Sequence, residues 1–292
     1  MQRVPAPAGS GSDTGTGTDT GEQGAPPPAN APGKTPVALQ LWTVRHEARR
    51  DFAGTLRQVA ALGYAGVEHV HSLGYGGLAA RQVRALMGEL GLGTAGGHVE
   101  LSEWEADMEA ILDYHAGLGA RHVAVSWVPA ERRRDESAYV QMADALRHIG
   151  ARCRDRGIRL VYHHHDFEFV RFGGRYALEL LLERVPPELL GVEVDVHWAR
   201  RAGEDPATFL GRVGGRCALV HFKDLSRAWA GSTDHADPEP FTEVGTGIID
   251  FGAVARASAH VPWRIVEQDF CAGSAWDSAR RSLENLRQMG LA

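Results

Sequence analysis

Histidines and carboxylates alternate with apolar residues in four short segments of the second half of the chain. The first of these segments contains three consecutive histidines, His163 to His165, after an apolar run. Successive side chains of a β-strand point to opposite faces, so His163 and His165 share one face and His164 takes the other. Imidazole nitrogens bind metals and transfer protons, which makes the face of His163 and His165 a candidate reactive surface.

The three later segments repeat this arrangement, each with two reactive side chains on one face. The first member of every pair belongs to a predicted lower ring of His163, Asp195, His221 and Glu267. The second member belongs to a predicted upper ring of His165, His197, Lys223 and Asp269. Because strands are staggered in a barrel, the sequence leaves open which four side chains lie level.

Two imidazoles and two carboxylates together are typical ligands of a divalent cation. Mixed nitrogen and oxygen ligands suit Mn, Zn, Co or Fe better than an ion that prefers oxygen alone. The expected cofactor is a divalent metal ion, and the sequence does not decide between Mn, Zn, Co and Mg. One such residue alone is more often a hydrogen-bonded core group. The whole set is harder to explain in that way, because burying unpaired carboxylates costs several kcal/mol each.

Aromatic and polar residues at the strand ends are the predicted substrate contacts. Tryptophan faces suit the apolar faces of a sugar ring, although tryptophan is more often simply a core residue. The predicted substrate-binding residues are His98, Trp42, His165, Trp198 and Asp269. Gly96 and Gly97, just before His98, are expected to leave space beside the substrate.

Strand-like and helical patterns alternate eight times from Pro36 onward. The predicted strands are Val37–Val44, Ala65–Val70, Leu92–Val99, His122–Val128, Ile158–His165, Leu189–Val196, Ala218–Leu225 and Arg264–Asp269. The predicted helices are Phe52–Leu62, Leu78–Leu90, Glu103–Leu118, Glu136–Arg156, Ala177–Arg184, Pro206–Val213, Phe251–His260 and Ala275–Met289.

Strict alternation indicates parallel strands joined by crossover helices, and eight such units predict an α/β fold of the (β/α)8 TIM-barrel type. A doubly wound open sheet is the alternative, but it usually has a glycine-rich turn after its first strand, whereas residues 42–45 contain no glycine. In a barrel the active site lies at the C-terminal ends of the strands, where the two predicted rings lie.

Composition sets the remaining expectations. Residues 1–35 are mostly Gly, Ser, Thr, Pro and Ala and predict a disordered tail, so that residues 36–292 form a single barrel domain. The net charge of −6 argues against a nucleic-acid partner. The sequence shows no signal peptide and no membrane-spanning run, so we expect no membrane partner. Its three scattered cysteines fit a reducing compartment, and we expect a cytoplasmic protein.

Five segments carry a resemblance to a known family: YHHHDFEF (162–169), VEVDVHWARRAGEDP (192–206), HFKDL (221–225), VGTGIIDF (244–251) and VEQDF (266–270). Together they resemble the sugar phosphate isomerase/epimerase family, xylose-isomerase-like TIM barrels that include inosose dehydratases and ketose 3-epimerases. The resemblance implies that Asp195, His221 and Glu267 are metal ligands. His163 stands where many epimerases of the family have a glutamate that is both ligand and base, which leaves the fourth ligand open.

The resemblance predicts a metal-dependent isomerase or epimerase that acts on a sugar, keto-sugar or sugar phosphate through an enediolate. Glu267 is the expected base, and His163 or His197 is the expected group on the opposite face of the substrate. Lys223, in the segment HFKDL (221–225), is expected to be a further catalytic residue. A lyase or dehydratase using the same site is the first alternative, and a metal-free sugar-binding or accessory subunit is the second. A zinc DNA-repair endonuclease is disfavoured by the acidic net charge. Barrels of this group commonly pair, so the resemblance makes a homodimer possible and leaves the oligomeric state open.

Overall fold

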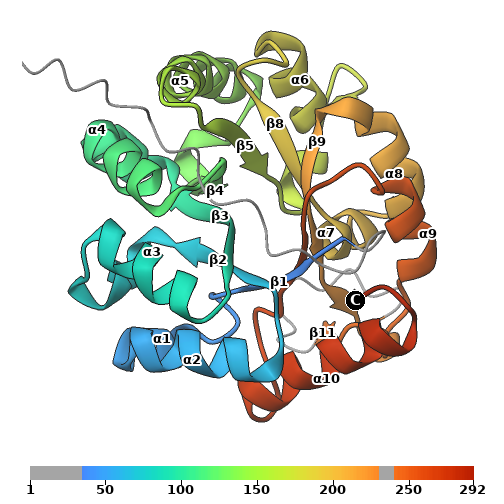
Figure 1. The fold of residues 1–292 in the computed structure, drawn as a ribbon. Helices are drawn as coiled ribbons and strands as arrows, with labels where there is room; N and C mark the ends of the chain where they lie inside the picture. Colours follow the sequence, from blue (N-terminus) through green and yellow to red (C-terminus); the bar gives the residue numbers. More distant parts are fainter. Residues whose placement is uncertain (1–34, 230–239) are drawn as a thin grey trace, which may run out of the picture.

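Eight parallel strands close into a barrel in the computed structural model, which describes residues 35–229 and 240–292 (Figure 1). The strands follow one another around the barrel in chain order. They are β1 (Val37–Gln40), β2 (Gly66–Val70), β3 (Gly93–Glu100), β4 (His122–Trp127), β5 (Arg159–His163), β8 (Gly191–Asp195), β9 (Cys217–Phe222) and β12 (Arg264–Val266). Because β12 pairs with β1, the sheet has no free edge, and the predicted (β/α)8 TIM barrel is confirmed.

Helices surround the barrel on its outer side (Figure 1). Eight of them correspond to the predicted ones: α2 (Phe52–Leu62), α3 (Ala80–Glu89), α4 (Leu101–Leu118), α5 (Glu136–Asp155), α6 (Ala177–Arg184), α8 (Pro206–Val213), α9 (Phe251–Ala257) and α10 (Ala275–Gln288). The ends of α2 and α4 illustrate how glycine stops these helices, since Gly63 and Gly119 both adopt a left-handed conformation there.

Several strands end earlier than predicted, because the chain turns at the C-terminal rim of the barrel. β1 ends at Gln40 and β12 at Val266. Two short helices, α1 (Arg45–Arg50) and α7 (Val196–Arg201), follow β1 and β8. Two-stranded sheets form outside the barrel, β6 (Arg171–Phe172) with β7 (Arg175–Tyr176) and β10 (Asp224–Leu225) with β11 (Phe241–Thr242). The predicted upper ring therefore lies on rim segments and not on the barrel strands.

Inward-facing side chains change from apolar to polar along β1, β5 and β9, and from β12 into the residue that follows it. A small apolar cluster, which includes Ala38, Val161, Leu219 and Ile265, fills one part of the barrel interior. Two residues further along the same strands, on the same face, stand Gln40, His163, His221 and Glu267. The barrel is thus filled at its N-terminal side and polar at its C-terminal side.

No helix in residues 35–229 or 240–292 is long and apolar enough to cross a membrane. Apart from its last residue, the predicted disordered tail of residues 1–35 lies outside the described residues.

Candidate active site

The C-terminal side of the barrel brings together the four residues of the predicted lower ring. One ligand atom from each of His163, Asp195, His221 and Glu267 lies within 4.8 Å of the others. His163 ends β5, Asp195 ends β8, His221 lies in β9, and Glu267 directly follows β12. We call these four residues the ligand cluster.

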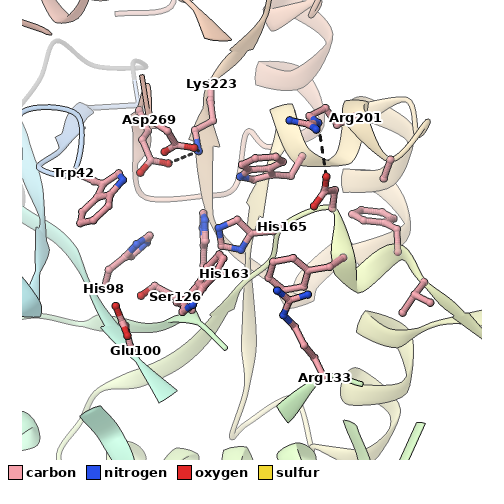
Figure 2. A pocket seen from close by; sticks show the side chains of 18 of the residues that line it. Trp42, His98, Glu100, Ser126, Arg133, His163, His165, Arg201, Lys223 and Asp269 are labelled. Atoms are coloured by element: carbon pink, nitrogen blue, oxygen red, sulfur yellow. Dashed lines mark hydrogen bonds and ion pairs between the residues drawn. The ribbon is translucent and has the colours of Figure 1, made fainter. Parts of the chain in front are cut away.

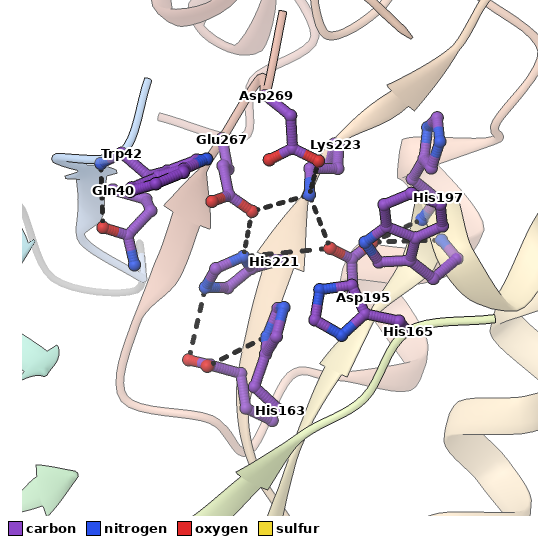
Figure 3. Close-up of polar contacts among 12 residues, drawn as sticks. Gln40, Trp42, His163, His165, Asp195, His197, His221, Lys223, Glu267 and Asp269 are labelled. Carbon is purple, nitrogen blue, oxygen red and sulfur yellow. Dashed lines mark hydrogen bonds and ion pairs between the residues drawn. The ribbon is translucent and has the colours of Figure 1, made fainter. Parts of the chain in front are cut away.

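His221 lies at the centre of the ligand cluster (Figure 3). Its Nδ1 is 2.9 Å from Glu267 Oε2 and 3.9 Å from Asp195 Oδ2. The ring centroids of His163 and His221 are 4.6 Å apart. Burial opposes protonation of His221, but the carboxylates around it outweigh burial and hold its pKa well above the usual value. The cluster therefore has a strongly negative potential that a cation would neutralise.

Lys223 places a buried ammonium beside the ligand cluster (Figure 3). Its Nζ lies 2.7 Å from Glu267 Oε2, 3.1 Å from Asp195 Oδ2 and 3.0 Å from Asp269 Oδ2. Burial alone would lower the pKa of Lys223, but the three carboxylates outweigh it and keep the pKa well above 10.5. Lys223 is charged at neutral pH as a result.

A second polar layer lies beneath the ligand cluster and orients it. Glu68 Oε2 is 2.7 Å from His221 Nε2 and accepts a 2.7 Å hydrogen bond from Gln40 Nε2. Glu193 Oε2 is 2.7 Å from His98 Nε2 and 3.2 Å from His163 Nδ1. A carboxylate at Nε2 of His221 favours a proton on that nitrogen, so that Nδ1 would supply the lone pair if a cation replaced its proton. Burial and the two glutamates act in opposite directions on His98, and the glutamates raise its pKa to about 10.

The donor set fits a divalent cation. Asp195 Oδ2 and His163 Nδ1 are buried and have no hydrogen bond of good geometry among the described residues, although both have charged or polar neighbours at ion-pair distance. Burial lowers the pKa of His163 to about 4, so its imidazole is neutral and offers a lone pair. Unsatisfied buried groups of this kind are explained by an ion that the four residues would hold together.

A second set of four residues also has one ligand atom each within 4.8 Å of the others. It contains His98 and Glu193 in place of Asp195 and Glu267. His98 and Glu193 already contact each other at 2.7 Å. Each combination contains a buried carboxylate oxygen without a hydrogen bond among the described residues, Asp195 Oδ2 in one and Glu193 Oε1 in the other. The ligand cluster is the better fit because its Glu267 lines the cavity above it, whereas Glu193 does not.

A cavity of about 1100 Å³ opens above the ligand cluster (Figure 2). It is lined by most of the predicted site residues, namely Trp42, His98, His163, His165, Trp198, Lys223, Glu267 and Asp269. Glu100 and Ser126 contribute further polar groups to its wall. Burial raises the pKa of Asp269 to about 6, an effect that Lys223 partly offsets.

His197, predicted as a catalytic residue, does not line this cavity. It lies in the first turn of α7, where its Nδ1 is 3.1 Å from the carbonyl oxygen of Asp224. Its ring stacks on Phe241 with the centroids 4.6 Å apart. Burial lowers the pKa of His197 to about 3. His197 therefore lies close to Asp195 and Lys223 but outside the cavity wall (Figure 3).

Two glutamates of the second layer were not predicted as site residues. Glu193 was recognisable, because it shares a strand face with Asp195. Glu68 gave a weaker signal, a single carboxylate in a short apolar strand. The prediction that Gly96 and Gly97 leave space for substrate is wrong. A Cβ at Gly96 would lie 2.6 Å from Glu68 Oε1, and a Cβ at Gly97 would lie 2.4 Å from the ring of His115.

Comparison with known proteins identifies relatives of the same architecture. Residues 56–288 match the family described as Xylose isomerase-like TIM barrel. Inosose dehydratase from Lacticaseibacillus casei is 29% identical over 146 residues, which are 46% of this chain and 48% of that protein. Inosose dehydratase from Bacillus anthracis is 25% identical over 181 residues, which are 54% of this chain and 60% of that protein. In these matches the chain spans about half the length of the curated relatives.

Solved structures share the fold at lower sequence identity. A sugar phosphate isomerase/epimerase from Parabacteroides distasonis superposes with a TM-score of 0.72 at 20% identity, covering 89% of this chain and 96% of that one. L-ribulose 3-epimerase superposes with a TM-score of 0.65 at 15% identity, covering 88% and 94%.

Proposed function

Because the chain belongs to the xylose isomerase-like TIM barrel family, we propose that it is a metal-dependent isomerase or epimerase of a sugar, keto-sugar or sugar phosphate, working through an enediolate. One observation carries the proposal: two imidazoles and two carboxylates, with ligand atoms within 4.8 Å, lie beneath a cavity that opens at the C-terminal side of the barrel. This is where TIM-barrel enzymes have their active sites.

The ligand cluster would hold the cation. When bound there, a divalent cation polarises a carbonyl and stabilises the negative charge of an enediolate. The second layer of Glu68 and Glu193 keeps the histidines of the cluster in a fixed orientation, as carboxylates behind metal-binding histidines commonly do.

Glu267 is the proposed base that removes the proton next to the substrate carbonyl. It lines the cavity, and although burial opposes its ionisation, Lys223 and His221 hold its pKa well below the usual value, so that it is a carboxylate. The Lys223 ammonium also lines the cavity and can donate to the oxygen on which charge develops. Return of the proton from Glu267 to the neighbouring carbon would complete an isomerisation. Inversion needs an acid on the other face, a role predicted for His163 that its low pKa and its place in the ligand cluster do not support.

Dehydration is a second candidate, favoured by the inosose dehydratases with which the chain shares 25–29% identity. The same proton removal would be followed by loss of a hydroxyl from the β-carbon. That step needs an acid, and the Lys223 ammonium, which lines the cavity, can supply the proton.

Solvent exchange tests the proposal. We expect the protein, loaded with Mn or Co in deuterated water, to incorporate deuterium at one carbon of a keto-sugar from a panel followed by NMR. Glu267→Gln should slow the exchange by roughly a hundredfold, the usual effect of losing a general base, whereas the exposed Glu131→Gln should leave it unchanged. A product lighter by one water identifies dehydration.

Absence of exchange with every keto-sugar in the metal-loaded protein contradicts the proposal. If the protein binds no stoichiometric metal at neutral pH, the alternative of a metal-free sugar-binding subunit is favoured.

A further inference from the structure

The cavity extends outward from the catalytic residues into an aromatic compartment. This outer pocket is lined by Trp127, Arg133, Phe167, Val170 and Phe172. Trp127 ends β4, and the other four residues lie in the segments that follow β4 and β5. Figure 2 shows Arg133 at the side of the cavity. None of these residues belongs to the ligand cluster or to its second layer.

His165 connects the outer pocket to the ligand cluster. Its ring centroid is 5.0 Å from that of His163, and on the other side it stacks on Phe167 at 5.0 Å with an interplanar angle of 14°. Trp127 meets the edges of both His165 and Phe167, with centroid distances of 5.1 and 5.6 Å. The wall of rings is therefore continuous from the catalytic residues to the outer pocket.

The outer pocket is held in place by contacts among its own residues and with residues behind it. The Arg133 guanidinium lies 3.7 Å from the ring centroid of Phe167, and its Nε donates to the carbonyl oxygen of Val128 at 3.1 Å. Phe172 packs against Tyr139 with a centroid distance of 5.7 Å. In contrast, Trp127 is 42% exposed and Val170 is 45% exposed. Fixed but exposed apolar side chains on a cavity wall are typical of a ligand-binding surface.

The cavity is also larger than a simple sugar requires. A monosaccharide fills roughly 200 Å³, the space of six or seven water molecules of about 30 Å³ each. The cavity has a volume of about 1100 Å³. Space therefore remains for another part of the ligand, and the part of the cavity next to His165 is lined by Trp127 and Phe167.

We infer that the substrate carries a planar aromatic substituent, which lies in the outer pocket while its polyhydroxylated part faces the ligand cluster. A flat ring can pack edge to face or offset on the exposed Trp127, in the geometries that aromatic pairs prefer, whereas the ring of Phe167 is already covered by His165 and Arg133. The position of the reacting part rests on the proposed function. The aromatic selectivity rests on the outer pocket alone and is measurable without turnover.

Two glycosides that differ only in their substituent test the inference. We expect the full-length protein, titrated in a calorimeter, to bind phenyl β-D-glucopyranoside about tenfold more tightly than methyl β-D-glucopyranoside, which corresponds to one good aromatic contact. Trp127→Ala should remove most of this preference and Trp127→Phe should retain it. Met289→Ala is the matched control, because Met289 is 41% exposed but does not line the cavity, and it should keep the full preference.

Equal affinities for the two glycosides, including no measurable binding of either, would overturn the inference, and so would a preference that survives Trp127→Ala. The two proposals fail separately. A phenyl preference without solvent exchange in any keto-sugar contradicts the proposed function and supports aromatic selectivity. Exchange in unsubstituted keto-sugars without a phenyl preference supports the proposed function and contradicts aromatic selectivity.

Discussion

Lys223 is a cation surrounded by the carboxylates that would bind a metal. The chain has two lysines, and Lys34 precedes the barrel, whereas all other basic residues are arginines. A compact ammonium fits between Asp195, Asp269 and Glu267, where the planar guanidinium of an arginine would need more space. In this position Lys223 neutralises part of the negative charge of the cluster.

Lys223→Met should destabilise the metal-free protein by about 3–5 kcal/mol, because it leaves buried carboxylates without their cation. Denaturant titration in the presence of a chelator measures this loss. Saturating Mn should stabilise the variant more than the wild type, since the cation replaces the missing ammonium. Arg212→Met is the control: it removes a cation from a half-exposed ion pair with Glu204, worth about 0–1 kcal/mol, and should not respond to Mn. A variant that gains no more from Mn than the wild type contradicts the prediction.

Strand alternation was sufficient to predict which side chains of four strands meet. It placed Asp195, His221 and Glu267 in one group with His163, and the structure brings these four together. Alternation could not predict the height of each side chain along the barrel axis, because that height depends on how neighbouring strands are paired. In the structure His163 pairs with Glu193, and Asp195 pairs with His221. In the second layer, Glu193 lies one alternation step below Asp195 on β8, whereas Glu68 lies on β2, outside the four strands compared in the prediction. The roles of these residues in catalysis stay predictions.

At the scale of elements, Asp224 fixes the segment that follows β9. Its carboxylate accepts hydrogen bonds from the backbone N–H groups of Leu225, Gly245, Gly247 and Ile249, at 2.8–3.2 Å. Gly247 approaches so closely that a Cβ there would lie 2.2 Å from the carbonyl oxygen of Leu225. Two segments about twenty residues apart are thus tied at the rim of the barrel by one side chain.

We expect Asp224→Ala to lower the free energy of unfolding by roughly 3 kcal/mol, because several backbone donors lose a charged acceptor. The matched control is Asp250→Ala, which removes the exposed N-cap of α9 and should cost about 1 kcal/mol. Denaturant unfolding of the two variants gives the comparison. Equal losses would show that Asp224 acts only as an ordinary cap.

Long helices were easier to predict than the short ones at the barrel rim. The predicted bounds of α2, α6 and α8 agree with the structure at both ends. The short helices α1 and α7 were not predicted, because six residues give fewer than two helical turns and no visible period of about 3.6. Arg45–Arg50 lies between the first predicted strand and the first predicted helix, and only Val196 of α7 was included in a predicted strand. In α7 the start is set by Asp195, whose Oδ1 accepts from the N–H of His197 at 2.9 Å. One carboxylate thus ends the strand and also belongs to the ligand cluster.

For the whole molecule, the barrel has a second group of buried histidines away from the cavity. His69 and His115 are fully buried near Tyr75. Neither ring nitrogen of His69 has a hydrogen-bond partner among the described residues. Burial lowers the pKa of His69 to about 4, and burial together with the neighbouring histidines lowers that of His115 to about 3. Both imidazoles are therefore neutral in the folded protein.

These depressed pKa values make the fold sensitive to acid. In the unfolded chain a histidine takes up its proton near pH 6.5, whereas folded His69 resists protonation until about pH 4. The stabilising contribution is therefore complete above pH 6.5 and is lost as the pH falls below that value, by about 2 kcal/mol at pH 5 for His69 alone. His69→Leu should reduce the fall in unfolding free energy between pH 7 and 5 by roughly that amount. The exposed His148→Gln should leave the pH profile unchanged, and parallel profiles of wild type and His69→Leu would contradict the prediction.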